Sequence, residues 1–213
     1  MSPDQPEQDM TIPTETASRI ATAVRTIATT TSSRLGSDCI WHALACRHLL
    51  AREGIDDARL VAGYAAWRVD GKAPGAVVCH HVDGVPCDPA SGGLAFHSWV
   101  SCGSQVFDAT TYQLRGKMAL MDTADGGRTP VRWSPPYVLV ERKQCHSWRS
   151  VRDGFRAGLS CYDAIPAITT RVAGHPDTHL EADAIDLLEQ VYARVKDGNQ
   201  LVLIGPCGIA ATA

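Results

Sequence analysis

The spacing of apolar residues along the chain predicts two helices near its beginning. Isoleucine and valine residues recur at helical spacing within residues 14–28, so we expect an amphipathic helix there. The residues before it, 1–14, are rich in Pro, Asp, Glu and Gln and poor in apolar side chains, so we expect a disordered lead. A Ser/Thr-rich connector at 29–36 separates this helix from the next.

The second helix is the clearest element of the pattern. Its apolar side is formed by Ile40, Leu44, Leu49 and Leu50. Ser37 is a good N-cap residue, Asp38 places a negative charge in the first turn, and Gly54 follows as a natural stop. Cys39 therefore falls in the first turn, where backbone N–H groups lack partners and the helix dipole is positive.

A series of strands follows these helices. Runs rich in β-branched, aromatic and small apolar residues predict strands at 59–69, 75–82, 96–102, 105–109 and 136–142. Gly103-Ser104 is well suited to a two-residue hairpin turn between the third and fourth of them. Helices followed by a mostly antiparallel sheet indicate an α+β domain.

The last third of the chain has a different pattern. We expect a short helix within 147–159 and a strongly amphipathic one at 178–195, ended by Asp197-Gly198. We therefore divide the chain into the lead, a core at 15–145, and a C-terminal helical extension at 146–213 that packs on the same domain.

Composition narrows the class of protein. The chain has 213 residues, 45% of them hydrophobic, and a net charge of −3, which fits a globular domain with a real core. It has no basic block and no long apolar run, so we expect neither a nucleic-acid partner nor a membrane partner. The acidic start, Met1-Ser2-Pro3-Asp4, does not fit a secretion signal, so we expect a cytoplasmic location. The oligomeric state is left open.

The eight cysteines form no CxxC pair, so the sequence does not indicate a zinc ribbon or a thioredoxin-type redox motif. Without a secretion signal, we expect reduced thiols, most of them serving as small buried apolar side chains.

Cys39 differs from the other thiols because later residues can activate it. A thiolate is the reactive form of cysteine, and a helix N-terminus and a nearby imidazolium both stabilise it. His97 lies on one arm of the predicted hairpin and Asp108 on the other. Counted outwards from the turn, they are offset by two positions, a diagonal relation within reach of a His-Asp contact.

These segments resemble a known family. The stretch from Cys39 to Tyr64, followed by His97-Ser98-Trp99-Val100 and Asp108-Ala109-Thr110, resembles the transglutaminase-like cysteine enzymes of the wider papain-like group. The resemblance covers residues 35–112. It is closest to small uncharacterised bacterial transglutaminase-like proteins, and the leader-cleaving proteases of lasso-peptide pathways are another relative.

The resemblance implies a papain-like core with the nucleophile at a helix N-terminus packed on an antiparallel sheet. Cys39 would attack an amide carbonyl, His97 would move the proton, and Asp108 would orient the imidazole. A thioester would then undergo hydrolysis or transfer, with a peptide or protein amide as substrate and no cofactor. Trp41 and Trp99 are the expected substrate contacts. The backbone N–H of Cys39 is one expected oxyanion donor, and the sequence does not identify the second.

Other hypotheses stay open. Cys39 could be a buried structural thiol in a catalytically silent fold that binds a peptide or protein. His42, three residues further along the helix, is a competing base, although we favour a structural role for it. A metal-dependent hydrolase would use His80 or His81 with Cys79 or Asp83. Adjacent histidines on a strand point to opposite faces, which disfavours a shared ion.

Overall fold

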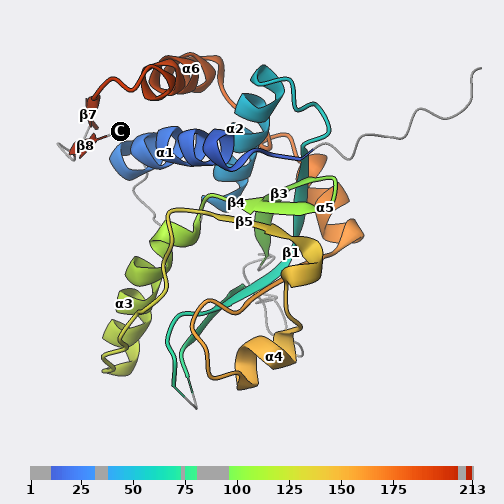
Figure 1. Ribbon diagram of the computed structural model, residues 1–213, viewed down its shortest axis with the longest axis vertical. Coiled ribbons are helices and arrows are strands. Elements are labelled where there is room, and N and C mark those ends of the chain that lie inside the picture. Colours follow the sequence, from blue (N-terminus) through green and yellow to red (C-terminus); the bar gives the residue numbers. More distant parts are fainter. Residues whose placement is uncertain (1–10, 32–37, 73–74, 81–95, 206–209, 213) are drawn as a thin grey trace, which may run out of the picture.

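The computed structural model describes residues 11–31, 38–72, 75–80, 96–205 and 210–212, and they form an α+β fold (Figure 1). The α-helices are α1 (Thr14–Thr31), α2 (Cys39–Arg52), α3 (Leu114–Asp125), α4 (Trp148–Asp153), α5 (Pro166–Ala173) and α6 (Ala182–Lys196). The strands are β1 (Arg59–Arg68), β2 (Val77–His80), β3 (His97–Cys102), β4 (Gln105–Asp108), β5 (Val138–Glu141), β6 (Ser160–Ala164), β7 (Val202–Ile204) and β8 (Ala210–Thr212). Two short 3-10 helices, η1 (Thr111–Gln113) and η2 (Arg142–Gln144), complete the described elements.

The main sheet is antiparallel and has the order β2-β1-β3-β4-β5, with β6 also paired to β1. Strand β1 changes neighbours along its length. Its first half, from Arg59 to Gly63, pairs with β3, and its second half lies between β6 and β2. This change of partners lets one long strand join two parts of a curled sheet, so that residues from β6 reach the region where β3 and β4 meet.

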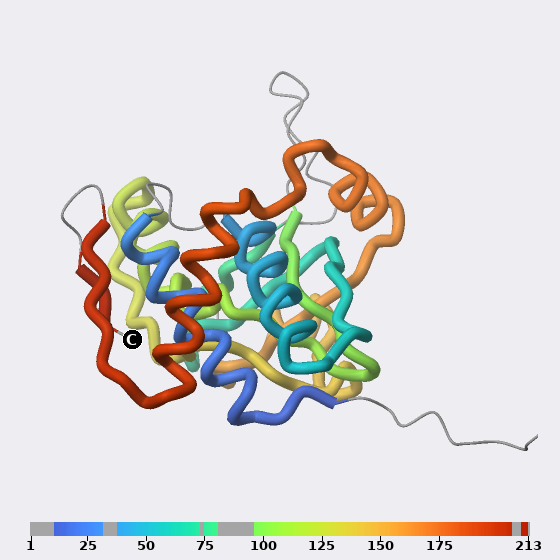
Figure 2. Tube along the Cα trace, turned by 90° about the horizontal axis from the view of Figure 1, so that it is seen from above, coloured from blue at the N-terminus to red at the C-terminus, as the bar shows by residue number. Residues whose placement is uncertain are grey.

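Three helices cover one face of the sheet. Helices α1, α2 and α6 contact one another, and Figure 2 shows them lying side by side. Their apolar sides meet Val100, Cys102 and Phe107 of β3 and β4 in the largest core cluster. Because α2 packs on β3, its first residue is held close to the beginning of that strand.

The opposite face carries a second core cluster, built from large aromatic and aliphatic side chains of several strands and of α3. Its members include Trp67, Trp99, Leu114, Met118 and Tyr162. His97 lies two positions before Trp99 in β3, and Asp108 lies two positions after Val106 in β4. Trp99 and Val106 belong to this cluster, and alternate residues of a strand share a face, so His97 and Asp108 also point to this face.

Most of the predicted elements of the first two thirds are confirmed, with shifted ends. Helix α1 continues three residues beyond the expected end, and the predicted strands lose one or more terminal residues. The N-cap position of α2 is Asp38, and its side chain makes no capping hydrogen bond. The expected cap Ser37 lies outside the described residues, as do the last two residues of the strand expected at 75–82.

The last third departs more from the expected pattern. The helix expected within 147–159 ends at Asp153, before Gly154, and is capped by the Ser147 side chain. Helix α6 begins four residues later than expected. The segment also contains the strand β6, which pairs with β1, so the region expected to be a helical extension supplies part of the main sheet. Helices α3 and α5 were not expected at all.

Residues close to the beginning of the chain belong to the packed structure. Residues 1–10 of the expected lead lie outside the described residues, but Ile12 is buried and its backbone N–H donates to Gln105 Oε1 at 2.6 Å. Within the part of the chain that the structure describes, no helix combines the length and the apolar character needed to cross a lipid bilayer.

Candidate active site

Cys39 is the first residue of α2 and is 7% exposed. Backbone N–H groups in a first helical turn have no partner within the helix, and the dipole there favours negative charge. The fold therefore places the thiol at a position that favours its ionised form, as the sequence predicted.

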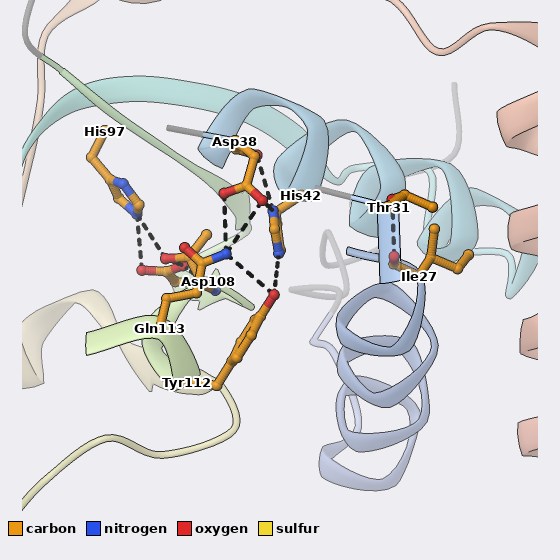
Figure 3. Close-up of polar contacts among 9 residues, drawn as sticks. Ile27, Thr31, Asp38, His42, His97, Asp108, Tyr112 and Gln113 are labelled. Carbon is orange, nitrogen blue, oxygen red and sulfur yellow. Dashed lines mark hydrogen bonds and ion pairs between the residues drawn. The ribbon is translucent and has the colours of Figure 1, made fainter. Parts of the chain in front are cut away.

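His97 and Asp108 form the best-defined contact of the site. His97 begins β3 and Asp108 ends β4, and His97 Nε2 lies 3.0 Å from Asp108 Oδ2 (Figure 3). The register pairs Val100 with Phe107, so continuing it makes His97 and Asp108 diagonal neighbours. The predicted offset of two positions is confirmed.

The Asp108 carboxylate is fully hydrogen-bonded although it is 1% exposed. Its Oδ1 accepts from the Thr110 backbone N–H at 2.9 Å and from the Thr110 hydroxyl at 2.7 Å. Its Oδ2 accepts from the Tyr162 hydroxyl at 2.8 Å as well as from His97. Burial by itself would raise the pKa of Asp108, but the charge and hydrogen bond of His97, together with Thr110, hold that pKa well below its usual value.

Because Nε2 of His97 is bonded to Asp108, Nδ1 is the nitrogen that remains for the Cys39 thiol. Nδ1 is buried and has no partner at strict hydrogen-bond geometry among the described residues. Cys39 and His97 nevertheless interact closely enough to shift each other's pKa. The His97–Asp108 hydrogen bond is therefore the defined contact among the three side chains, and Cys39 influences His97 without a hydrogen bond of strict geometry.

The pKa directions favour a thiolate–imidazolium pair. Burial opposes ionisation of Cys39, but the contact and charge of His97, the backbone N–H of Ser98 and the charge of Lys117 together lower its pKa. Burial would also lower the pKa of His97, but Asp108 and Cys39 raise it to about 9. The low pKa of the thiol and the high pKa of the imidazole describe one coupled pair.

Asp38 lies next to Cys39 in the chain, and its negative charge would oppose a thiolate. The structure engages that carboxylate elsewhere, because the Gln113 side-chain amide donates to Asp38 Oδ1 at 3.1 Å and to Oδ2 at 3.3 Å (Figure 3). Gln113 belongs to η1, which follows Asp108 by a few residues. This contact ties the start of α2 to the segment that carries the carboxylate of the site.

His42 is occupied by the same network. Its Nδ1 lies 2.9 Å from the Asp38 carbonyl oxygen, so Nδ1 carries the proton and donates. Its Nε2 then accepts from the Tyr112 hydroxyl at 3.1 Å. Burial lowers the pKa of His42 despite the opposing charge of Asp38, so the ring stays neutral. His42 therefore supports the start of the helix, which agrees with the structural role favoured for it.

His80 lies against His97. Its ring centroid is 4.9 Å from that of His97, and its Nε2 is 2.8 Å from Lys117 Nζ. Among the described residues no group of three His, Cys, Asp or Glu side chains could hold an ion. His81 and Asp83, the other candidate ligands, lie outside the described residues. Cys79 is described, but burial raises the pKa of its thiol.

The two tryptophans expected to contact substrate have different positions. Trp99 is 1% exposed and its ring stacks on His97 with centroids 6.2 Å apart, so it packs the core beneath the imidazole and offers no open surface. This corrects the expected role of Trp99. Trp41 is partly buried against the helical core, with its ring edge-on to His42 at 5.5 Å.

Two residues that contact the site were not identified from the sequence. Tyr162 reaches Asp108 from β6, and Lys117 reaches His80 from α3. Neither lies within the resembling segment or beside a motif, so no local signal marks them. Only the folding of β6 onto β1 and of α3 beside β2 brings them to the site.

A partly open cavity of about 340 Å³ lies next to this region and is lined in part by Tyr64, His146, Trp148, Cys161 and Tyr162. Tyr162, which donates a hydrogen bond to Asp108, lines this cavity. Cys39, His97 and Asp108 are not among its lining residues. We therefore locate the candidate chemistry by the contacts of the three side chains and not by this cavity.

Comparisons with known proteins give the fold only. No family model matches the chain, and no curated protein sequence matches it. A solved structure described as the crystal structure of genomics APC5867 is similar, with a TM-score of 0.58 and 19% identity over 95% of this chain and 91% of that chain. At this identity the likeness extends to the α+β arrangement and carries no information about activity.

Proposed function

We propose that the protein is a cysteine-dependent enzyme with a transglutaminase-like, papain-like core that performs acyl chemistry on an amide or peptide. The observation that carries the proposal is the His97–Asp108 hydrogen bond, 3.0 Å from Nε2 to Oδ2, with His97 on the strand that packs against the helix that begins at Cys39. The opposed pKa shifts of the thiol and the imidazole support the same roles.

In the proposed reaction the Cys39 thiolate attacks the amide carbonyl carbon, which forms a C–S bond. The His97 imidazolium donates its proton to the leaving amine as the C–N bond breaks, and a thioester remains. Water then attacks the thioester while His97 accepts a proton, and the thiolate leaves. Asp108 keeps the imidazole oriented and stabilises its charged form. We favour hydrolysis over transfer because water is always present and no acceptor-amine site has been identified.

The direct test is covalent labelling by a thiol-reactive acyl probe, with the labelled residue located by mass spectrometry. Wild-type protein should be labelled at Cys39, and Cys39→Ala should abolish that label. Cys46→Ala is the matched control, because Cys46 lies seven residues further along the same helix, is buried, and has a pKa raised by that burial. Undiminished labelling of another cysteine in Cys39→Ala would contradict the assignment.

A second candidate is a catalytically silent protein that binds a peptide or protein with the same fold. The low exposure of Cys39, 7%, favours this alternative because a substrate carbonyl must reach the sulfur. The two candidates differ in the thiol itself. A silent fold predicts a Cys39 pKa near the ordinary value of about 8.5 and no turnover of any amide in a peptide library. A lowered pKa together with turnover supports the enzyme.

A further inference from the structure

A lysine ammonium lies in a half-buried position next to His80, whose ring packs against the ring of His97. Lys117 projects from α3, and its Nζ donates to His80 Nε2 at 2.8 Å. The same ammonium lies 5.9 Å from the centroid of the Trp67 ring, a distance at which a cation is attracted to the face of an indole. Two contacts from different strands therefore fix the position of this charge.

His80 is held in the tautomer whose Nε2 can accept a hydrogen bond from Lys117. The Phe96 backbone carbonyl accepts a hydrogen bond from the ring, which leaves the lone pair of Nε2 for Lys117. Burial and the neighbouring charge of His97 lower the pKa of His80 to about 2, so the ring stays neutral beside the imidazolium. His80 therefore adds no positive charge beside Lys117.

The charge of Lys117 acts on the reacting group. It is one of the smaller causes that lower the pKa of Cys39. Burial lowers the pKa of Lys117 itself, and the charges of Asp108, Cys39 and Asp38 only partly offset that shift. No ion pair joins Lys117 to a carboxylate within the residues that the structure describes. Its ammonium therefore has donors left over after the bond to His80.

We propose that Lys117 stabilises the negative charge that develops on the substrate carbonyl oxygen when Cys39 attacks. This inference rests on the proposed function and supplies an oxyanion donor beside the backbone N–H of Cys39. In that step the thiolate electron pair forms the S–C bond and the carbonyl π electrons move to the oxygen. The negative charge moves from sulfur to a neighbouring oxygen and stays near Lys117.

The same charges indicate the substrate class. Asp38 and Asp108 already place two carboxylates near the thiolate, so a substrate bearing its own carboxylate at this point would add a third carboxylate and a fourth negative charge. A neutral amide adds none, because its oxyanion only receives the charge that the thiolate loses. The site therefore suits an amide whose acyl portion carries no negative charge next to the scissile bond.

Two reagents that need the same thiolate but differ in transition state test the inference. p-Nitrophenyl acetate acylates Cys39 through a tetrahedral oxyanion, whereas iodoacetamide alkylates it by direct displacement with no oxyanion. Both rate constants are proportional to the fraction of Cys39 present as thiolate, so that fraction cancels from their ratio. Both rates are measured on the full chain, corrected with Cys39→Ala, and the modified residue is located by mass spectrometry.

Lys117→Met should lower the acylation-to-alkylation ratio by about 100-fold, the usual effect of losing an oxyanion donor. Lys117→Arg keeps the charge and should stay within about tenfold of wild type. Arg115→Met is the matched control, because it removes an exposed positive charge two residues away on the same helix, and its ratio should not change. Thermal unfolding of each variant verifies that it is folded.

The outcomes separate this inference from the function on which it rests. If wild-type protein is acylated at Cys39 and Lys117→Met keeps the wild-type ratio, Lys117 does not stabilise the oxyanion although the nucleophile is real. Equal losses of both rates, or the same loss in Arg115→Met, also overturn the inference. If wild-type protein reacts at Cys39 with neither reagent, the proposed function itself fails.

Discussion

The Tyr162 hydroxyl donates a hydrogen bond of 2.8 Å to Asp108 Oδ2, which links β6 to the end of β4 across 54 residues of sequence. The same hydroxyl accepts from the Trp67 indole N–H at 2.9 Å, so Tyr162 is fixed from both sides. The last third of the chain therefore holds the carboxylate that orients His97. We regard Tyr162 as a positioning residue that acts through Asp108.

Tyr162→Phe should weaken the site while leaving the fold intact. The change removes a donor to Asp108 and leaves the buried Trp67 N–H without a partner, which should lower the free energy of unfolding by about 1–3 kcal/mol. The looser carboxylate should also lower the pKa of His97 and slow alkylation of Cys39. Denaturant unfolding and the pH dependence of iodoacetamide alkylation measure the two effects.

Tyr137→Phe is the control for this variant, because among the described residues the Tyr137 hydroxyl makes only a long hydrogen bond of 3.4 Å, to the Thr14 carbonyl oxygen. It should change neither the stability nor the alkylation profile by a comparable amount. A Tyr162→Phe protein that loses stability but keeps the wild-type alkylation profile would assign Tyr162 a purely structural role.

His97→Ala should turn Cys39 into an unreactive thiol. Burial raises the pKa of Cys39 and His97 is the largest opposing influence, so its removal should bring that pKa above the ordinary value of about 8.5. The alkylation rate of Cys39 at pH 7 should then fall by about tenfold or more, because the thiolate is the nucleophile. His48→Ala, at a histidine that contacts Glu189 at 2.9 Å on α6, should leave the rate unchanged.

The charge state of His97 can be followed directly by NMR of its ring nitrogens. Because its pKa is raised to about 9, the ring should stay protonated at pH 7 and lose its charge as the pH rises through about 9. Asp108→Asn removes the negative charge that does most to raise the pKa of His97 against the effect of burial, so the titration midpoint of the ring should fall. A wild-type midpoint at or below about 6.5, the ordinary value, would show that no stable imidazolium exists here.

Two glycine substitutions should change the free energy of unfolding in opposite directions, and the first of them tests the β1–β6 pairing that places Tyr162 beside Asp108. A Cβ at Gly63 would collide with the Asp163 backbone oxygen where β1 and β6 pair, so Gly63→Ala should lower the free energy of unfolding by about 1–3 kcal/mol. In contrast, a Cβ at Gly116 in α3 meets nothing within 4 Å. Gly116→Ala should raise the stability by up to about 1 kcal/mol. Equal effects of the two changes on the unfolding midpoint would contradict this account.

The parts of the site that could be read from the sequence depend on short-range geometry. The position of Cys39 follows from the apolar spacing of its helix, and the His97–Asp108 contact follows from counting along a hairpin with a tight turn. Both relations lie within one element or between adjacent strands. The same local signals gave the ends of α2 to within one or two residues, although the N-cap residue is Asp38 and not Ser37.

The roles of individual neighbours could not be read in this way. Trp99 alternates onto the same face as His97, but alternation does not tell whether that face is open, and its ring proves to be buried. Asp38 places a negative charge beside Cys39, and nothing local in the sequence shows that Gln113, 75 residues away, donates a hydrogen bond to its carboxylate. Such pairings depend on how distant elements pack.

The sequence by itself determined where the Cys39 thiol, the His97 imidazole and the Asp108 carboxylate would lie along two local elements. Helical and strand periodicity fix those relations within a few residues. Only the tertiary structure decided what surrounds them: β6 brings Tyr162 to Asp108, α3 brings Lys117 to His80, and η1 brings Gln113 to Asp38. The physical reason is that pKa shifts and hydrogen bonds in a buried site depend on contacts in space, and those contacts join residues whose separation in sequence leaves no periodic trace.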